Sequence, residues 1–379
     1  MYLSQLHLSN FRSYTSLDLE LSPGTTILVG SNGYGKTNIV EAVQYLATLG
    51  SHRVSSDQPL IRRGSDIATI GARVHAGIGD DRCLSLAIDL RSGAANRALL
   101  NKAPVRPREL RGAVRTIFFA PEDLAIVQGD PSERRQFIDE LIVSRWPRLA
   151  GIRSEYDRAL KQKTALLKAI SGRSLRGAGG GAEETVAVWD EEIAKLGAEI
   201  VAARLRTLSD SEDMVARHYS TIAPKSNLAS VSYHSSAVAH DSQADADFLR
   251  ITLAEAIAMR KSEEIARGVC LVGPHRDDCS LSLGDLPVRG YASHGESWSF
   301  ALALRLASLD LLREDGVEPI LILDDVFAEL DKSRRLAVVA AIDSVEQAFI
   351  TVAVPHDLPQ NLEGSVYEVT PGTVVKKEV

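Results

Sequence analysis

The sequence has few cysteines and no long apolar run. Its three cysteines, Cys83, Cys270 and Cys279, are odd in number and lack metal-ligand spacing, which fits a reduced, cytoplasmic setting. The chain contains no run of about 18 apolar residues, so no transmembrane helix is expected. The first residues lack a basic region followed by an apolar segment, so no secretory signal is expected. We therefore expect a cytoplasmic protein without a membrane partner.

Positive charge is also limited. The formal net charge of −7 argues against wholesale coating of the protein by nucleic acid, although a local basic patch stays open. Apolar residues make up 45% of the chain, which is ordinary for a globular protein with a hydrophobic core. A length of 379 residues predicts two or three domains.

One stretch fits the phosphate-binding P-loop pattern G-x-x-x-x-G-K-[ST]. It consists of Gly30, Ser31, Asn32, Gly33, Tyr34, Gly35, Lys36 and Thr37. Glycines let the backbone wrap around phosphate oxygens with its N–H groups pointing inward. We expect Lys36 to reach the β- and γ-phosphates and Thr37 to offer its hydroxyl to Mg²⁺.

The flanks of this loop support a nucleotide site. Residues 26–29 form a short apolar run typical of a buried strand, and residues 38–49 carry apolar side chains at helical spacing. The loop is therefore expected at a helix N-terminus, where the helix dipole favours an anion.

A second strand pattern ends in two acids. Residues 320–323 are continuously apolar and precede Asp324 and Asp325. We expect this strand to lie next to the P-loop strand, with Asp324 holding Mg²⁺ and Asp325 orienting or deprotonating the attacking water. The alternative is an acidic strand end at the surface.

The N-terminal third reads as β-rich. Residues 1–25 predict two antiparallel strands joined at 10–14, and Arg12 in that turn lies either near the nucleotide or in solvent. Residues 67–119 predict a small antiparallel sheet with a hairpin at 97–105. Between positions 97 and 115 there are six basic residues and only one acidic residue. They form either a solvated face or a surface that contacts a nucleic-acid phosphate backbone. They are Arg97, Lys102, Arg106, Arg108, Arg111 and Arg115.

Residues 133–265 are mostly helical in pattern. Pro131 suits a helix start, and residues 153–170 and 186–223 predict a helical hairpin joined by a glycine-rich link at 171–181. His234 and His240 fall in a polar stretch and are expected in loops. This segment is expected to form a second, helical lobe.

A serine turn precedes the next helical pattern. Ser293 and Glu296 form S-x-x-E, which is a capping box. The same turn could bind an anion at the helix N-terminus. Because the P-loop already serves the chain's own nucleotide, that anion would belong to the nucleotide of another subunit.

Together these motifs resemble the ATP-binding-cassette ATPases and, more narrowly, the RecF family, bacterial recombination mediators related to the SMC proteins and similar here to actinobacterial members. The resemblance covers nearly the whole chain. It rests on residues 10–14, 30–37, 51–53, 121–124, 129–139, 273–278, 293–296 and 324–331.

The resemblance implies an α/β fold: a P-loop ATPase head with a mixed sheet and an antiparallel β subdomain, plus a helical second lobe. The head would span 1–120 and 266–379, and the helical lobe 121–265. It implies ATP and Mg²⁺ as cofactors and a homodimer when ATP is bound. Ser293 would then contact the other chain's nucleotide, and Asp331 would lie in a loop crossing the interface.

The resemblance further implies a function in recombinational DNA repair. The chain would bind duplex DNA beside single-strand gaps and support recombinase loading with RecO- and RecR-like partners. Slow hydrolysis, with Asp325 and Lys36 as catalytic residues, would release the DNA.

Some residues depart from the family pattern, and rival functions stay open. His294 and Glu296 replace the Gly and Gln often found in the signature, Asp325 replaces a Glu, and His356 is a doubtful switch histidine because Pro355 intervenes. His275 is expected to order a turn. The rivals are a transporter ATPase subunit, a structural DNA-bridging protein with ATP as a static ligand, and a P-loop kinase.

Overall fold

The computed structural model describes residues 1–171, 181–235, 237–238, 245–359 and 362–377. They form two compact units. The first unit comprises Met1–Asp123, His218–Lys225 and Trp298–Val379, and the second Leu124–Arg217 and Ser226–Ser297. Most of the glycine-rich link and His240 lie outside the described residues.

The first unit contains an antiparallel sheet of six strands in the order β2-β1-β4-β5-β6-β7. Its strands are β1 (Tyr2–Phe11), β2 (Tyr14–Glu20), β4 (Ile67–His75), β5 (Cys83–Arg91), β6 (Arg97–Leu100) and β7 (Ala103–Val105). The predicted hairpin is confirmed, with Asn101 and Lys102 at positive φ in the tight turn between β6 and β7. The two antiparallel strands expected in residues 1–25 are confirmed, and they bury Leu3, Leu6, Leu8, Leu17 and Leu19 in the core.

A second sheet of the first unit carries the motifs, in the order β15-β14-β3-β13-β12-β8. Its strands are β3 (Gly24–Val29), β8 (Thr116–Phe119), β12 (Ile320–Asp324), β13 (Gln347–Val352), β14 (Ser365–Thr370) and β15 (Thr373–Lys376). All pairs are parallel except β14 with β15. The prediction that β12 adjoins the P-loop strand is wrong, because β13, buried along its whole length, pairs with both β3 and β12.

Helices cover these sheets and close the core. They are α1 (Lys36–Thr48), α8 (Lys332–Ser344) and most of α7 (His294–Glu314). Short 3₁₀ turns are η1 (Gln58–Leu60), η2 (Pro107–Leu110), η3 (Pro121–Asp123), η4 (Phe327–Glu329) and η5 (Pro355–Asp357). Ile39 and Val43 of α1 share one hydrophobic cluster with Leu28, Ile322 and Phe349, so the apolar stripe predicted for α1 faces the core.

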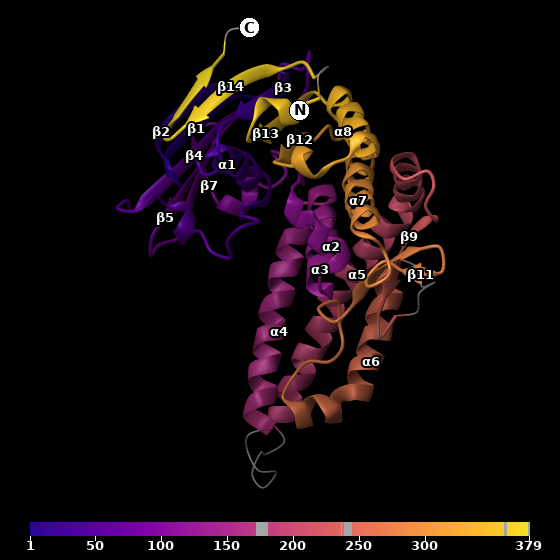
Figure 1. The fold of residues 1–379 in the computed structure, drawn as a ribbon. Coiled ribbons are helices and arrows are strands. Elements are labelled where there is room, and N and C mark those ends of the chain that lie inside the picture. The colour runs from indigo at the N-terminus through magenta and orange to yellow at the C-terminus, as the bar shows by residue number, and fades with distance from the viewer. Residues whose placement is uncertain (172–180, 236, 239–244, 360–361, 378–379) are drawn as a thin grey trace. The chain divides into compact units, whose positions relative to one another are not determined.

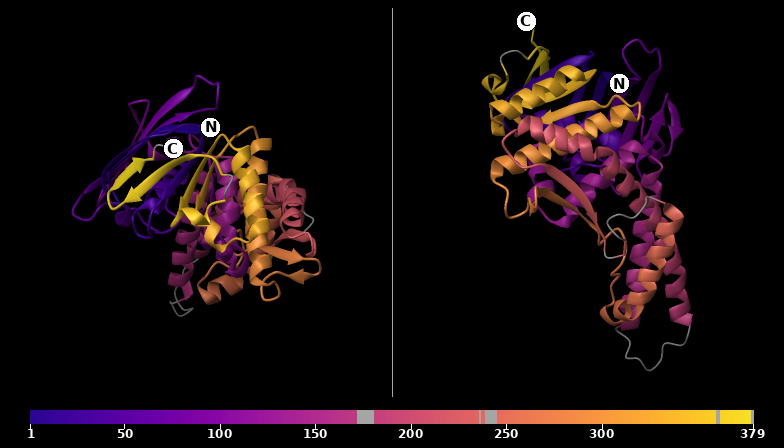
Figure 2. Two further views of the ribbon diagram at one scale, coloured as in Figure 1. Left: turned by 45° about the horizontal axis from the view of Figure 1, so that its top comes forward. Right: turned by 90° about the vertical axis from the view of Figure 1, so that its right-hand side faces the viewer.

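The second unit is built on the predicted helices. They are α2 (Leu124–Gln128), α3 (Pro131–Arg145), α4 (Leu149–Ser171), α5 (Gly181–Ile222), whose last residues belong to the first unit, and α6 (Ala246–Arg267). Figure 1 and Figure 2 show α4, α5 and α6 as long helices side by side. Apolar side chains of the three helices belong to one hydrophobic cluster. None of the helices in the described ranges is long and apolar enough to cross a membrane.

A small sheet of the second unit was not predicted. Its order is β11-β10-β9, formed by β9 (Ala229–His234), β10 (Asp278–Leu283) and β11 (Leu286–Pro287). The expectation of a loop at His234 is therefore wrong, since it ends a strand and pairs with Asp278. Residues 266–297 also belong to the second unit, whereas the resemblance implied that they lie in the ATPase head.

Candidate nucleotide-binding site

The P-loop runs from the end of β3 to the start of α1. Gly33 and Gly35 have φ values of 85° and 106°, a conformation that suits glycine. A Cβ on Gly30 would lie 2.3 Å from the Val369 carbonyl oxygen, and one on Gly35 would lie 2.8 Å from Ser13 Oγ. Conformation therefore favours glycine at position 33, space requires it at position 30, and both apply at position 35.

Lys36 lies inside the loop. Its side chain is buried, and Nζ donates a hydrogen bond of 2.6 Å to the Gly30 carbonyl oxygen. Burial lowers the pKa of Lys36, and the nearby carboxylates of Asp325 and Asp324 oppose that shift. Carbonyl groups satisfy the donors of an ammonium group without neutralising its charge, so the loop is suited to an anion.

The hydroxyl of Thr37 and the carboxylate of Asp324 lie together. Thr37 Oγ1 donates to Asp324 Oδ1 over 3.2 Å, and Thr351 Oγ1 donates to the same oxygen over 2.6 Å. Burial raises the pKa of Asp324, and the two hydroxyl groups partly offset this. Hydroxyl and carboxylate oxygens are the hard ligands that Mg²⁺ accepts, so this pair fits the ion. Sequence reasoning missed Thr351, although it lies at the same edge of the parallel sheet.

Thr37 and Asp324 supply only two oxygen ligands between them. Among the residues that the structure describes, no group of three or more His, Cys, Asp or Glu side chains could hold a metal ion. Mg²⁺ usually keeps waters and substrate phosphates among its ligands, so one carboxylate and one hydroxyl are compatible with it.

Asp325 adopts a strained backbone conformation. Its φ of 56° is unusual for a residue other than glycine. The backbone N–H of Asp325 donates to Thr351, at 3.2 Å to the carbonyl oxygen and 3.0 Å to Oγ1. Thr351 therefore fixes both acids that end β12, and such strain is often found at functional sites.

Arg12 does not have a free guanidinium group. It donates to both carboxylate oxygens of Glu41 on α1, over 2.6 and 2.9 Å, and to the Pro59 carbonyl oxygen over 3.1 Å. Glu41 is fully buried and also accepts from Ser51 Oγ over 2.5 Å. Arg12 therefore anchors α1 to the turn after β1, and its predicted contact with nucleotide stays a prediction. Sequence reasoning missed Glu41 as the buried partner of Arg12.

The serine turn lies in the second unit and has the predicted capping box. The Ser293 amide and hydroxyl both donate to Glu296 Oε2 over 2.8 Å, and Ser293 Oγ accepts from the Glu296 amide over 3.2 Å. Hydrogen bonds from Ser293 lower the pKa of Glu296. Ser293 thus begins α7 in the way that its spacing predicts.

A turn at residues 273–278 is held by a polar network within the second unit. Arg134 pairs with Asp278 through two hydrogen bonds of 2.8 Å, and Arg204 donates 2.8 Å to the Pro274 carbonyl oxygen. Tyr156 OH lies 2.6 Å from His275 Nδ1, and burial lowers the pKa of His275 to about 4. The turn-ordering role expected for His275 agrees with this contact.

Two other sequence candidates have local partners. Asp331 caps α8, accepting from the Arg334 amide over 3.0 Å. His356 is 82% exposed at its side chain and lies 3.5 Å from Asp357. Nothing in these contacts assigns His356 a switch role.

The basic residues of the β6–β7 region differ in exposure. Arg97, Lys102, Arg106 and Arg108 are exposed, whereas Arg111 and Arg115 are half-buried. Arg115 donates 2.7 Å to the Gly112 carbonyl oxygen, and burial lowers its pKa. The exposed members alone could form a contact surface.

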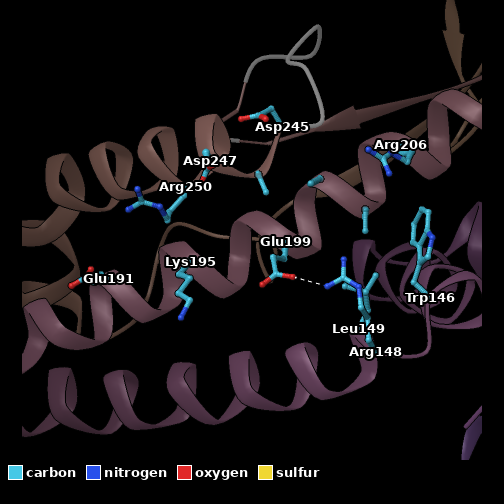
Figure 3. Close-up of a pocket in the computed structure, with 13 residues that line it drawn as sticks. Trp146, Arg148, Leu149, Glu191, Lys195, Glu199, Arg206, Asp245, Asp247 and Arg250 are labelled. Carbon is cyan, nitrogen blue, oxygen red and sulfur yellow. Dashed lines mark hydrogen bonds and ion pairs between the residues drawn. The ribbon is translucent and has the colours of Figure 1, made fainter.

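A pocket in the second unit is a poor candidate for the nucleotide. It has a volume of about 810 Å³ and lies among α4, α5 and α6 (Figure 3). Basic and acidic side chains alternate along it, and Arg148 pairs with Glu199 over 3.0 Å. This mixed lining neutralises itself and offers no phosphate-binding loop.

The fold and the family comparison define the class of protein. Residues 2–373 match the family described as the RecF/RecN/SMC N terminal domain. The SmcHead bound to the C-winged helix domain of ScpA has a similar fold, with a TM-score of 0.57 and 17% identity over 100% of this chain and 98% of that chain. The chain thus has the α/β fold of an SMC-type ATPase head.

Relatives at higher identity narrow the class to one family. The DNA replication and repair protein RecF of Cutibacterium acnes (strain DSM 16379 / KPA171202) is 47% identical over 390 residues, which cover 100% of this chain and 99% of the relative. RecF of Rhodococcus erythropolis (strain PR4 / NBRC 100887) is 47% identical over 385 residues, which cover 97% of this chain and 93% of the relative. The chain belongs to the RecF family.

Solved structures agree with this. The recombination mediator protein RecF-ATPrS in the RecFOR pathway has a TM-score of 0.89 and 25% identity, and covers 99% of this chain and 98% of that chain. The structure of RecF-ATP in the same pathway also has a TM-score of 0.89 and 25% identity, and the match covers 100% of this chain and 98% of that chain.

Proposed function

We propose that this chain is an ATP-dependent DNA-binding protein of recombinational repair, in which ATP binding drives dimerisation on DNA and slow hydrolysis ends it. The observation that carries the proposal is the position of Lys36, buried inside a glycine-rich loop with Thr37 beside Asp324. RecF-ATP among the structural relatives supports ATP as the nucleotide.

Each residue of the site has a proposed role. The amides of residues 30–37 bind the phosphates, and Lys36 neutralises the β- and γ-phosphates. Thr37 and Asp324 would hold Mg²⁺, and the ion would supply charge stabilisation at the phosphates. Asp325, fixed by Thr351, orients the attacking water and accepts its proton. Arg12 anchors α1, the helix that follows the P-loop, through Glu41.

The dimer brings the serine turn into the reaction. Ser293 of one chain binds the γ-phosphate held by the P-loop of the other, so that each site needs two chains. This proposal rests on the family, and on a helix N-terminus whose serine already holds a carboxylate.

The proposed partners are nucleic acid and two proteins. Duplex DNA beside a single-strand gap is the proposed ligand, with the exposed basic residues of the β6–β7 region contacting phosphates. RecO- and RecR-like proteins are the proposed partners in loading recombinase, which the RecFOR description of the structural relatives supports. A cytoplasmic site of action follows from that role.

The test measures how tightly the protein binds a fluorescently labelled gapped DNA duplex. The parent protein is measured with ATP and without nucleotide, and the Asp325→Asn variant is measured with ATP. The proposal expects tight binding only with ATP, and release from the variant at least tenfold slower after dilution. Equally tight DNA binding with and without ATP would contradict the proposal. Equal release rates for the variant and the parent protein would favour the static-ligand, DNA-bridging alternative.

A further inference from the structure

The carboxylate of Glu296 is held as a phosphate oxygen would be held. One of its oxygens, Oε2, accepts from both the amide and the hydroxyl of Ser293 over 2.8 Å. Its other oxygen, Oε1, accepts from Ser226 Oγ over 3.1 Å. All of these residues belong to the second unit. An amide and a hydroxyl converging on one anionic oxygen at a helix N-terminus form the usual donor set for phosphate.

The occupant of these donors is an anion at neutral pH. Hydrogen bonds from Ser293 hold the pKa of Glu296 below its usual value. Ser293 is exposed and Glu296 is half-buried, so a second molecule can approach the turn. The donors that Ser293 would offer to a foreign phosphate are therefore already used by a charge of the same sign.

We propose that Glu296 is an internal competitor that occupies Ser293 in the single chain and must leave it when the γ-phosphate of a second copy of this chain arrives. This inference rests on the proposed ATP-driven dimer. Glu296 thus opposes closure of the dimer and sets how much ATP-bound chain is needed for it.

Binding of the foreign phosphate exchanges one acceptor of the Ser293 donors for another. When the phosphate replaces Glu296, the Ser293 amide and hydroxyl keep one acceptor each, so these bonds change little in net free energy. What remains is repulsion between two anions placed a few ångströms apart, which is substantial away from bulk water. Ser226 stays bonded to Oε1 and gives the displaced carboxylate a partner.

A glutamine at position 296 separates this role from simple capping. Glutamine and glutamate both serve the last position of a capping box, so Glu296→Gln keeps the start of α7. The variant removes only the negative charge. A residue that merely caps the helix would leave the dimer unchanged when substituted in this way.

The experiment measures dimerisation by sedimentation velocity over a range of protein concentrations, with ATP and with no nucleotide. The samples are the parent protein, Glu296→Gln, Ser293→Ala and Asp245→Asn. Asp245 is the matched control, since it caps α6 of the same unit by accepting from the Phe248 amide over 2.8 Å. We expect Glu296→Gln to lower the dimer dissociation constant in ATP about tenfold, an advantage that salt reduces. Asp245→Asn leaves the constant unchanged.

The outcomes distinguish this inference from the proposed function. If Ser293→Ala weakens the dimer while Glu296→Gln dimerises as weakly as the parent protein or more weakly, Glu296 is not a competitor. The proposed shared site would still stand. If Ser293→Ala dimerises like the parent protein, both are overturned. ATP affinity at concentrations below dimerisation is expected to be equal in all four proteins, and thermal unfolding identifies any loss of fold in Ser293→Ala.

Discussion

The hydroxyl of Thr37 lies 3.2 Å from a carboxylate oxygen of Asp324, although 287 positions separate them in the chain. The contact joins the first turn of α1 to the end of β12, across the intervening strand β13. β13 itself contributes Thr351, which bonds the same oxygen. Three elements thus converge on one buried carboxylate.

Removing the ammonium group of Lys36 is expected to weaken nucleotide binding strongly. Charge-assisted hydrogen bonds are worth about 1.5–3 kcal/mol each, so Lys36→Ala should weaken ATP binding by about 100-fold or more. Titration calorimetry measures this, with the exposed Lys161→Ala as control. Tight binding by Lys36→Ala would refute the P-loop assignment.

Neutralising Asp324 is expected to stabilise the chain without nucleotide. Burial raises the pKa of this carboxyl group, so its charged form costs stability above that pKa, and the cost disappears as pH falls through it. Asp324→Asn should raise Tm by about 2 °C at neutral pH. The same variant should lose the further rise that Mg²⁺ and ATP give the parent protein.

Differential scanning calorimetry with and without Mg²⁺ and ATP checks both halves of this prediction. Asp325→Asn is the control, because Asp325 is less buried. A lower Tm for nucleotide-free Asp324→Asn would contradict the desolvation argument.

Protonation of His275 is expected to destabilise the second unit. Its pKa is lowered from 6.5 to about 4 by burial, so the neutral ring contributes stability above pH 6.5 that is lost as pH falls toward 4. Between pH 7.5 and pH 5 this amounts to about 2 kcal/mol. Urea unfolding of His275→Gln should show a pH dependence smaller by that amount. The exposed His356→Gln should behave as the parent protein does.

Charge removal at the β6–β7 hairpin is expected to weaken DNA binding in a salt-dependent way. Arg97→Gln with Lys102→Gln removes two exposed cations, so the slope of log affinity against log salt should fall by about 2. Arg158→Gln with Lys161→Gln on α4 is the matched control. An unchanged slope of log affinity against log salt in the hairpin variant would mean that the hairpin is a solvated face that does not contact DNA phosphates.

Much of the site could be predicted because its signals are local. The P-loop glycines, Lys36 and the two acids after an apolar strand each act through their own few residues, and spacing alone identified them. The capping box of Ser293 and Glu296 is local in the same way. Sequence periodicity also predicted β1, β2 and the helices α4 and α5.

What sequence reasoning missed depends on distant partners. The order of strands in a parallel sheet is set by connections between remote segments, so the place of β13 beside β12 was not visible. The pairing of Arg12 with Glu41 is likewise tertiary, since either residue alone reads as a surface charge. The strand β9 was missed because its serines and its histidine resemble a loop in composition.

The most direct test of a shared active site is ATP turnover per chain as a function of protein concentration, with and without gapped duplex DNA. If Ser293 of one chain completes the site of another, the slow rate per chain rises with concentration, and DNA shifts that rise to lower concentration. A rate per chain that is independent of both concentration and DNA would mean a self-contained site and would contradict the proposed dimer.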